Sequence, residues 1–541
     1  MKYAQHLNPK QTPQTAPIPG SKQIPNSGGG YSFQVDDWTR LRRFLILGSE
    51  GGSYYATERK LTLQNAQCVQ RCLAADGKRT VDEIVKISQE GRAPKNDPAI
   101  FALALACRSK DPEVANHARG AIPKVCRIGT HLFHLVEALQ TLGGWGRGIR
   151  HAIANWYLSQ DYDDLAYQLI KYPSRDSWSH RDVLRKAHAK PADDIYRSMF
   201  GWVTEKKKPA WGDTVLAPED PLSQLWASDT VKSLDVEKKA DLDRLTQMIS
   251  AYRLPREALP TEALNKAEVW EVLLQDMPVH ALVRNLGKMS EVGLIAPLSA
   301  GEKRAMEILG DGERLRRARL HPMQVLVALN TYRRGHGVKG SLKWDVSQRI
   351  VDALDEAFYA TFATIEPTGK RTLLGIDCSA SMRSPELAGM TGITPTVGAA
   401  VMAMVTARVE KQHYFFGFCH KFVDLKISPR MRLDEVEHIV QRSDFGSTDC
   451  SLPMAHAYKN NLEVDAFLVY TDSETNHGNI HPAQAIKQYR RERVDGAKLA
   501  VIAFTANNVS IADPADGGMM DFCGLDTSMP QVIADFVGGR I

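Results

Sequence analysis

The hydrophobic pattern of this sequence changes once, close to residue 366, and that change limits the fold more than any other feature. From Val35 to Thr364 apolar residues recur at intervals of three and four, which is the pattern of amphipathic helices. From Glu366 onward, short apolar runs typical of buried strands alternate with helical stretches. A chain of 541 residues is also too long to fold around one hydrophobic core. We therefore expect a helical module at residues 31–365 and an α/β domain at residues 366–541.

The first thirty residues fit neither pattern. The stretch from Asn8 to Gly30 is polar and rich in Pro, Gln and Gly, and the N-terminus lacks the charged-then-apolar pattern of a secretory signal. We expect residues 1–30 to form a flexible tail.

Two features predict where the protein resides. No stretch approaches the roughly twenty apolar residues that a membrane span needs. The eight cysteines are scattered and show no paired spacing, which indicates reduced thiols. We expect a cytoplasmic protein that does not enter a membrane.

The helical pattern is interrupted at short intervals. Examples of these helix breaks are Asp76-Gly77, Glu90-Gly91 and Leu254-Pro255. Many short helices joined by short turns predict an α-solenoid, in which each helical pair buries its apolar face against its neighbours. Since no strict period is visible, we expect loosely defined repeats of the HEAT type.

The C-terminal part shows the pattern of a doubly wound α/β domain. We expect strands at residues 371–376, 466–470 and 498–504, and the last two are largely continuous apolar runs. Residues 413–427 predict two strands with a tight connection, and residues 396–409 predict a helix. Helices between such strands indicate a mainly parallel sheet.

Oxygen-bearing side chains follow two of these expected strands. A D-x-S-x-S motif at residues 377–381 ends the first strand, and an aspartate closes the strand at 466–470. A threonine lies in the loop at 446–449. Doubly wound folds bind ligands at this edge of the sheet, and Mg²⁺ prefers oxygen ligands. The candidate metal ligands are Asp377, Ser379, Ser381, Thr448 and Asp472. The alternative is that the serines cap a helix and the aspartates are turn residues.

Positive charge is concentrated in the helical part. Residues 366–541 hold 17 Lys and Arg against 21 Asp and Glu, which leaves a net charge of +9 for residues 1–365. Such an excess indicates an anionic partner, most often nucleic acid. Basic residues cluster at 145–156 and 171–190, although a solvated charged face is the alternative for any one of them. The candidate RNA contacts are Arg147, Arg150, Lys171, Arg175, His180, Arg185 and His188.

Catalytic motifs are missing from the sequence. It contains no Walker A motif, no H-E-x-x-H and no G-x-S-x-G. A G-x-G-x-x-G pattern at residues 335–340 follows a helical segment, so we interpret it as a loop. A metal-dependent nuclease usually needs more clustered carboxylates than this metal motif offers. We expect a protein that is not an enzyme, and a metal-dependent protein-adhesion scaffold is the alternative to RNA binding.

Longer stretches resemble known families. The metal motif, with its threonine loop and strand-end aspartate, resembles the metal-ion-dependent adhesion site of a von Willebrand factor A domain. The segments LRRFLILGSEGGSYY at 41–55, VCRIGTHLF at 125–133, WSHRDVLRKAHAKP at 178–191, GSTDCSLPM at 446–454 and IADPADGGMMDFCGLDT at 511–527 resemble the Ro ribonucleoprotein family. The resemblance extends along almost the whole chain.

The Ro resemblance implies a ring of HEAT-like repeats, the TROVE module, closed by the von Willebrand factor A domain. It implies that a basic central hole holds the single-stranded 3′ ends of misfolded non-coding RNAs. A Y RNA would bind the outer surface, and Lys171, Arg175 and His188 match family residues associated with Y RNA binding. In bacteria the Y RNA can tether a 3′ exoribonuclease. We expect a monomer.

The adhesion-site resemblance implies roles for the metal ligands. Ser379, Ser381 and Thr448 would coordinate a divalent ion such as Mg²⁺ through their hydroxyls. Asp377 and Asp472 would act directly or through water, and the open position would accept a carboxylate or phosphate from a partner.

Overall fold

The computed structural model describes residues 11–48, 66–204, 211, 214–337, 340–362, 365–383, 386–387, 390, 392–442 and 446–541. The end of the Ro-like segment at 41–55 and two positions of the glycine-rich loop at 335–340 therefore lie outside the described residues.

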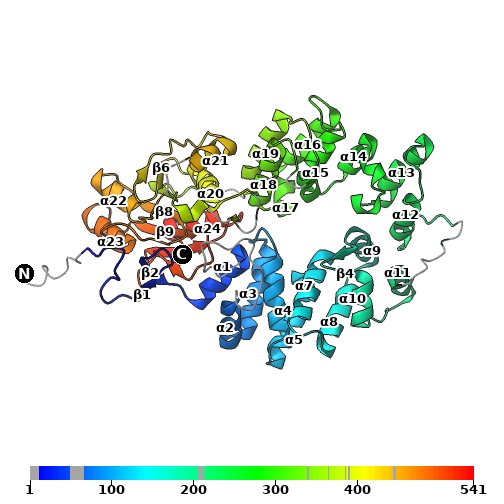
Figure 1. Cartoon of the computed structure of the whole chain (residues 1–541), viewed down its shortest axis with the longest axis horizontal. Helices are drawn as coiled ribbons and strands as arrows, with labels where there is room; N and C mark the ends of the chain where they lie inside the picture. The colour runs from blue at the N-terminus through cyan, green and yellow to red at the C-terminus, as the bar shows by residue number, and fades with distance from the viewer. Residues whose placement is uncertain are drawn as a thin grey trace, which may run out of the picture.

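Helices occupy most of the chain before residue 361 and form two rows (Figure 1). The first row contains α1 Asp37–Leu47, α2 Gln67–Ala75, α3 Gly77–Glu90, α4 Asp97–Cys107, α5 Pro112–Gly120, α6 Ile122–Val125, α7 Gly129–Thr141, α8 Arg147–Leu158, α9 Tyr162–Lys171, α10 His180–Ala187 and α11 Asp194–Thr204. The second row contains α12 Ser223–Val231, α13 Lys239–Tyr252, α14 Ala267–Gln275, α15 Val279–Glu291, α16 Ala300–Gly310, α17 Gly312–Arg317, α18 Pro322–Arg333 and α19 Gln348–Ala360, with the short 3₁₀ turns η3 Arg256–Ala258 and η4 Glu262–Asn265.

Local side chains set where several helices begin and end. Asp36, Asp76 and Asp161 each accept a hydrogen bond from a backbone N–H in the first turn of the helix that follows. Gly91 ends α3 with φ of 68°, a left-handed conformation that favours glycine. The helix breaks predicted at residues 76–77 and 90–91 are therefore confirmed.

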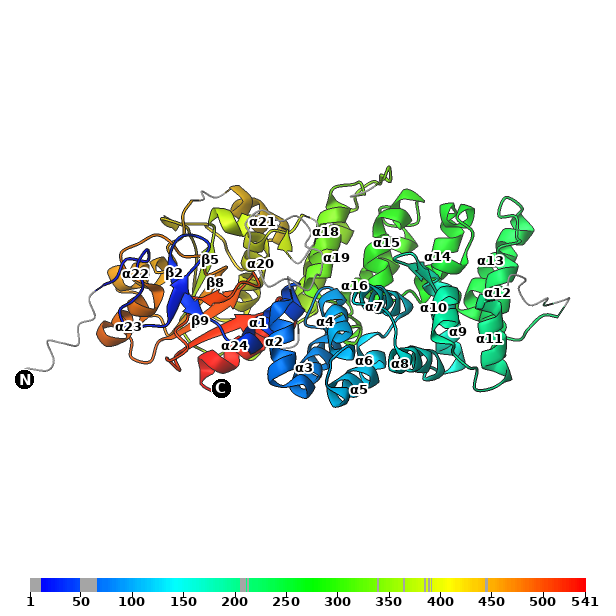
Figure 2. The same cartoon turned by 60° about the horizontal axis from the view of Figure 1, so that its bottom comes forward.

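The two rows meet at both ends. At the end far from the sheet, α9 packs against α12. At the other end, the Gln324 amide donates a hydrogen bond to the carbonyl of Pro94 at 3.1 Å, and the Arg319 guanidinium donates to the carbonyl of Gln89. Figure 2 shows the same arrangement from a second side. The predicted solenoid ring is therefore confirmed, and these contacts close it between helical segments, in addition to the contacts that both rows make with the C-terminal domain.

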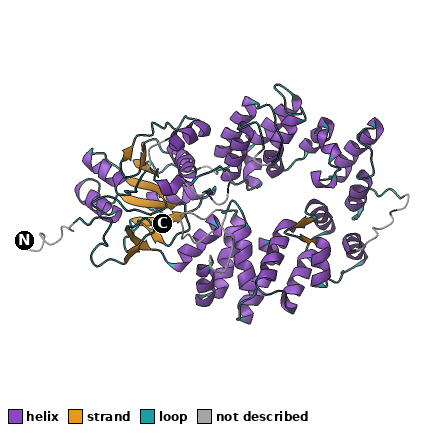
Figure 3. Ribbon diagram, viewed as in Figure 1, coloured by secondary structure: helices purple, strands orange, loops and turns teal. Residues whose placement is uncertain are grey.

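A six-stranded sheet forms the C-terminal domain (Figure 3). The strand order is β11-β9-β8-β5-β6-β7, and every neighbouring pair is parallel except β6 with β7. The strands are β5 Thr372–Asp377, β6 His413–Phe418, β7 Phe422–Val423, β8 Ala466–Thr471, β9 Lys498–Ala503 and β11 Met519–Cys523. The helices are α20 Pro395–Val409, α21 Leu433–Arg442, α22 Leu452–Lys459, α23 Pro482–Glu492 and α24 Met529–Gly538, with the 3₁₀ turn η5 Ala380–Arg383. This is the predicted doubly wound architecture.

Both faces of the sheet are buried. In β8, Phe467 and Val469 pack in the core that includes α22 and α23, whereas Leu468 and Tyr470 pack in the core that includes α20 and α24. The second of these cores continues into α14–α19 of the ring. The ring and the sheet therefore share a hydrophobic core. In the described part of the chain, no helix combines the length and the apolar composition that a bilayer crossing needs.

The prediction of a flexible N-terminal tail is wrong for residues 11–30. Strands β1 Gln23–Pro25 and β2 Tyr31–Gln34 form a small antiparallel sheet with β10 Val509–Ser510 of the C-terminal domain. The polar composition is misleading because these polar groups are hydrogen-bonded to a domain more than 400 positions further along the chain. Residues 1–10 lie outside the described residues.

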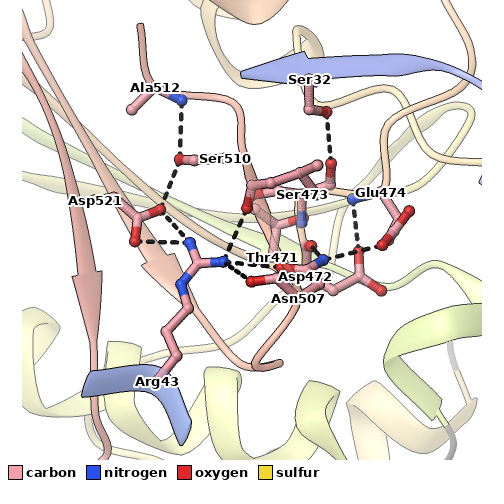
Figure 4. Close-up of polar contacts among 11 residues, drawn as sticks. Ser32, Arg43, Thr471, Asp472, Ser473, Glu474, Asn507, Ser510, Ala512 and Asp521 are labelled. Atoms are coloured by element: carbon pink, nitrogen blue, oxygen red, sulfur yellow. Dashed lines mark hydrogen bonds and ion pairs between the residues drawn. The ribbon is translucent and has the colours of Figure 1, made fainter. Parts of the chain in front are cut away.

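One buried arginine joins the first helix of the ring to the sheet domain (Figure 4). Arg43 of α1 is fully buried and pairs with both carboxylate oxygens of Asp521 in β11 at 2.7 Å. Its other terminal nitrogen donates to the carbonyls of Asn507 and Val509 at 2.8 and 2.9 Å. Because the two terminal nitrogens of one buried guanidinium bond to three residues of the sheet domain, this contact restricts how α1 lies against the sheet.

We expect Arg43→Met to lower the free energy of unfolding by about 3–5 kcal/mol, because it leaves the Asp521 carboxylate with no cationic partner at a largely buried site. Urea denaturation followed by tryptophan fluorescence measures the change. The matched control is Arg42→Met, which removes a partly exposed pair with Glu83 and should change the stability by at most about 1 kcal/mol. Equal losses in the two variants would contradict this assignment.

Candidate functional site

The two candidate metal carboxylates lie at the ends of neighbouring strands. Asp377 ends β5 and Asp472 follows β8, and these strands are paired in parallel. One oxygen of Asp377 accepts a hydrogen bond from the backbone N–H of Ser379 at 2.9 Å, and the other accepts from the hydroxyl of Thr471 at 2.6 Å. Parallel pairing thus brings together two residues that are 95 positions apart in the sequence.

The hydroxyl-bearing candidates lie on the same edge. The hydroxyls of Ser379 and Ser381 are 3.0 Å apart. The backbone N–H of Ala380 donates to the carbonyl of Gly446 at 3.4 Å, which joins this turn to the Thr448 loop. The backbone N–H of Thr448 donates to the side chain of Asn476 at 2.9 Å. Among the described residues the Thr448 hydroxyl has no hydrogen bond, so it is available as a ligand.

Burial dominates the electrostatics of this edge. Burial, and then the neighbouring charge of Asp472, raises the pKa of Asp377 well above its ordinary value. Burial also raises the pKa of Asp472. Neither carboxylate forms an ion pair with a cationic side chain of the described residues. Two buried carboxylates without a cation make a divalent ion a favourable addition.

The donor set fits a hard cation. Carboxylate and hydroxyl oxygens are the ligands that Mg²⁺ prefers, and within the described ranges no group of three or more His, Cys, Asp or Glu side chains could hold a metal by itself. The hydroxyls of Ser379, Ser381 and Thr448 would therefore complete the coordination that Asp377 and Asp472 begin. Such an ion would supply an electrophilic open position for an anionic oxygen of a partner.

The backbone beside this edge is strained. Ser473, next to Asp472, has φ of 63°, and its buried hydroxyl has no hydrogen-bond partner among the described residues. A left-handed conformation at a residue other than glycine often marks a functional site. The sequence analysis missed Ser473, since no local pattern predicts its conformation.

Two candidate RNA contacts lie in the first turn of α8. Arg147 and Arg150 are three positions apart, so they lie on the same side of the helix, and both are exposed. Neither forms an ion pair with a carboxylate in the described part of the chain. Their positive charges are therefore available to phosphate groups.

Two more candidates lie on or just before a small hairpin that interrupts the helices. Strands β3 Ser174–Arg175 and β4 Trp178–Ser179 are joined by a turn whose two residues have positive φ. Arg175 is exposed on this hairpin. Lys171, at the end of α9, donates to the Tyr167 hydroxyl at 2.5 Å.

The remaining exposed candidates lie on and after α10. Arg185 is exposed and donates to the carbonyl of Thr204 at 2.8 Å. His188 caps the C-terminal end of the helix with φ of 53° and is also exposed. The hairpin and α10 are in contact, so Arg175 and Arg185 belong to one continuous part of the first row.

Comparison with known proteins decides the family. The sequence model of the TROVE domain matches residues 24–253 and 247–332, and that of the Ro60 vWA domain matches residues 371–537. The chain is 37% identical over 538 residues to the RNA-binding protein RO60 of Deinococcus radiodurans, with 99% of both chains covered. It is 35% identical over 593 residues to the RNA-binding protein RO60 of Caenorhabditis elegans, with 96% of this chain and 90% of the relative covered. The chain belongs to the Ro60 family.

A solved Ro60-family structure has the same overall fold. The crystal structure of the Deinococcus radiodurans RO (RSR) protein matches with a TM-score of 0.68 and 34% sequence identity. The match covers 94% of this chain and 100% of that chain. The resemblance to the Ro family and to the von Willebrand factor A domain is therefore confirmed.

His180 is the exception among the RNA candidates in this Ro60-family chain. It is 2% exposed, its ring lies against Phe133 and Trp156, and its Nδ1 is 2.9 Å from the Tyr157 hydroxyl. Burial lowers the pKa of His180 to about 4, so the ring is neutral at pH 7. The prediction of direct RNA contact is wrong for His180 in this conformation, because the helix that it begins turns the ring inward.

An aromatic cluster beside these candidates was not predicted as a site. The rings of Trp145 and Trp178 are stacked with centroids 5.8 Å apart, and the Lys186 ammonium lies 5.1 Å from each. Lys186 also donates to the Gln140 side chain at 2.5 Å. The spacing of tryptophan and basic residues was visible in the sequence, but the contact needs three elements to meet.

We expect Asp377→Asn to raise the unfolding free energy of the metal-free protein at pH 7 by on the order of 1–3 kcal/mol, because it removes a buried charge without a cationic partner. A carboxylate whose pKa is raised on folding destabilises the fold fully above the folded-state pKa, and this cost is lost progressively as the pH falls from there to the unfolded-state pKa. The difference between the wild type and the variant should therefore shrink as the pH falls below 7.

Thermal unfolding with EDTA or with Mg²⁺ measures this effect. Mg²⁺ should raise the Tm of the wild type and leave that of Asp377→Asn nearly unchanged. Asp495→Asn, at an exposed position, is the control and should respond to Mg²⁺ like the wild type. A metal-induced shift that survives in Asp377→Asn would contradict the assigned ligand.

We expect His180→Ala to lower the unfolding free energy by about 2–4 kcal/mol, because it opens a cavity and leaves the Tyr157 hydroxyl without its partner. The RNA affinity of the folded fraction should not change. His151→Ala, at an exposed position of α8, should change stability by less than about 0.5 kcal/mol. Chemical denaturation and filter binding on the same preparations separate the two effects.

Proposed function

We propose that this chain is a non-enzymatic RNA-binding protein of non-coding RNA quality control. The observation that carries the proposal is its similarity, over nearly the whole chain, to two relatives that are each named RNA-binding protein RO60. We propose that it binds a Y RNA on the outer surface of the ring and the single-stranded 3′ ends of misfolded RNAs in a basic central hole. It would act as a cytoplasmic monomer, with a 3′ exoribonuclease as a further partner in bacteria.

The exposed arginines support RNA binding on physical grounds. Arg147 and Arg150 have no carboxylate partner within the described ranges, whereas Arg175, exposed on a hairpin, lies 3.7 Å from the carboxylate of Asp176. Unpaired guanidinium groups bind phosphate and release the counterions that the phosphates had condensed. Recognition through phosphates reads little base sequence, which suits a protein that binds many misfolded RNAs.

A metal-dependent protein-adhesion site is the second candidate function. The buried carboxylates Asp377 and Asp472, which have no cationic partner among the described residues, favour it. A divalent ion there would bind an acidic group of a partner protein. The two functions are compatible, because the metal edge and the arginines of α8 lie in different domains.

We expect the double variant Arg147→Gln with Arg150→Gln to bind a structured RNA more weakly than the wild type. The slope of log affinity against log salt concentration should become shallower by about one to two units, because two phosphate contacts are lost. Filter binding across a salt series, with and without a single-stranded 3′ tail on the RNA, measures both quantities.

The matched control removes the same charge from arginines that already have carboxylate partners. Arg197→Gln with Arg317→Gln should leave the salt slope unchanged, since these exposed side chains pair with Asp194 and Glu313.

In the same assay His188→Ser should weaken binding of a Y RNA. Absence of RNA binding under every condition would refute the proposed function and favour the protein-adhesion site.

A further inference from the structure

The segment from Thr12 to Gln34, here called the N-terminal strap, lies on the two loops that carry metal ligands. Gln14 in the strap is fully buried. Its side-chain amide donates to the carboxylate of Asp449 at 2.7 Å, and its side-chain carbonyl accepts from the hydroxyl of Thr475. Asp449 follows Thr448, and Thr475 lies in the loop that Asp472 begins. One glutamine therefore links the Thr448 loop to the Asp472 loop.

The strap contacts the Asp472 loop at three further positions. The Asn26 amide donates to the carbonyl of Thr475 at 2.7 Å. The backbone N–H of Gly28 donates to the carboxylate of Glu474 at 3.0 Å. The hydroxyl of Ser32 donates to the carbonyl of Ser473 at 2.9 Å (Figure 4). Consecutive residues of the loop are thus hydrogen-bonded to the strap.

The strap is also fixed to the helix that follows this loop. The Nε2 atom of His481 lies 2.8 Å from the carbonyl of Ala16. The backbone N–H of Thr12 donates to the side chain of Gln484 at 3.1 Å. Both partners lie at the start of α23, so the strap holds the loop together with its downstream anchor.

Contacts with the ring hold the loop from its other side. The side-chain amide of Asn507 donates to the backbone carbonyl of Asp472 at 2.5 Å and to Glu474 at 3.0 Å. Asn507 in turn accepts from Arg43 through its own side chain at 2.8 Å (Figure 4). Asp472 is therefore positioned by a residue that the first helix of the ring holds in place.

We propose that the N-terminal strap is a positioning part of the metal site, and that docking of the strap and binding of the metal stabilise each other. This inference rests on the metal site proposed above. Two buried carboxylates oppose their own approach when no cation is present, so the loops need other contacts to stay in a metal-binding arrangement. A site that is already arranged binds its ligand more tightly because less order is lost on binding.

The pattern of contacts favours this positioning role over simple coverage of the sheet domain. The pairing of β1 with β2, and of β2 with β10, would be enough to cover that surface. The buried polar atoms of Gln14, Asn26 and Ser32 instead reach the backbone and side chains of the two ligand-bearing loops. The effects must also be reciprocal, because coupling between two binding events changes both by the same factor.

Gln14→Ala in the full-length protein tests the proposal. We expect its affinity for Mn²⁺, measured by equilibrium dialysis, to fall about tenfold, which corresponds to about 1.4 kcal/mol. Gln11→Ala, at an exposed position three residues earlier, is the matched control and should bind Mn²⁺ like the wild type. In the unmodified protein, Mg²⁺ should slow hydrogen exchange of backbone amides in the strap.

Ser32→Ala is the second variant, in case Gln14→Ala does not fold. It removes a single hydroxyl, which donates to the carbonyl of Ser473 and accepts from the Asn26 amide. It should also weaken Mn²⁺ binding, by a smaller factor. Wild-type affinity in both variants, or strap exchange that does not respond to Mg²⁺, would overturn the strap proposal and leave the metal site in place. Failure of the wild type to bind Mn²⁺ would overturn the metal site itself, and the strap proposal with it.

Discussion

The position of the first ring helix, α1, against the sheet depends on one buried cation. The Arg43 guanidinium is fully buried, and its two terminal nitrogens bond to Asp521 and to three further oxygens of Asn507 and Val509, while its Nε has no partner among the described residues. A buried charge has few alternative arrangements of comparable energy, so the position of α1 relative to β11 is set closely. The hydrophobic core that α14–α19 share with one face of the sheet stabilises this arrangement further by burying apolar surface.

At the ends of β5 and β8 the buried charges are negative, and no cation of the described residues is paired with them. The side chains of Asp377 and Asp472 are as deeply buried as that of Arg43, yet no cationic side chain of the described residues pairs with them. Hydroxyls and backbone N–H groups hold the two carboxylates in place, and the Asn507 side chain connects Asp472 to the Arg43 contact. The same small network therefore holds α1 against the sheet domain and arranges the loop of Asp472, a candidate metal ligand. We expect a substitution at the Arg43 contact to shift the Asp472 loop, and a substitution in that loop to alter the Arg43 contact, through hydrogen bonds and short backbone segments.

Local patterns predicted much of this arrangement. The D-x-S-x-S motif at 377–381 and the aspartate after residues 466–471 were found because parallel strands end at one edge, and that rule needs no knowledge of packing. The RNA candidates were found by charge, and charge alone does not report burial. His180 lies within the same basic run as the exposed His188, but its position at the start of α10 turns it into the core. The polar composition of residues 1–30 likewise predicted a flexible tail, whereas Gln14 within that stretch is fully buried.

The sequence by itself determined the helical ring region, the doubly wound sheet, the order of the candidate metal ligands and the basic helices. These depend on periods of two and of three to four residues, on capping and on charge, all of which act within a few positions. Only the tertiary structure decided the docking of the N-terminal strap, the Arg43 contact and the inward position of His180. Their partners in the sheet domain lie more than 400 positions away for the strap and for Arg43. Hydrogen bonds over such separations follow from how whole elements pack, and no short stretch of sequence carries that information.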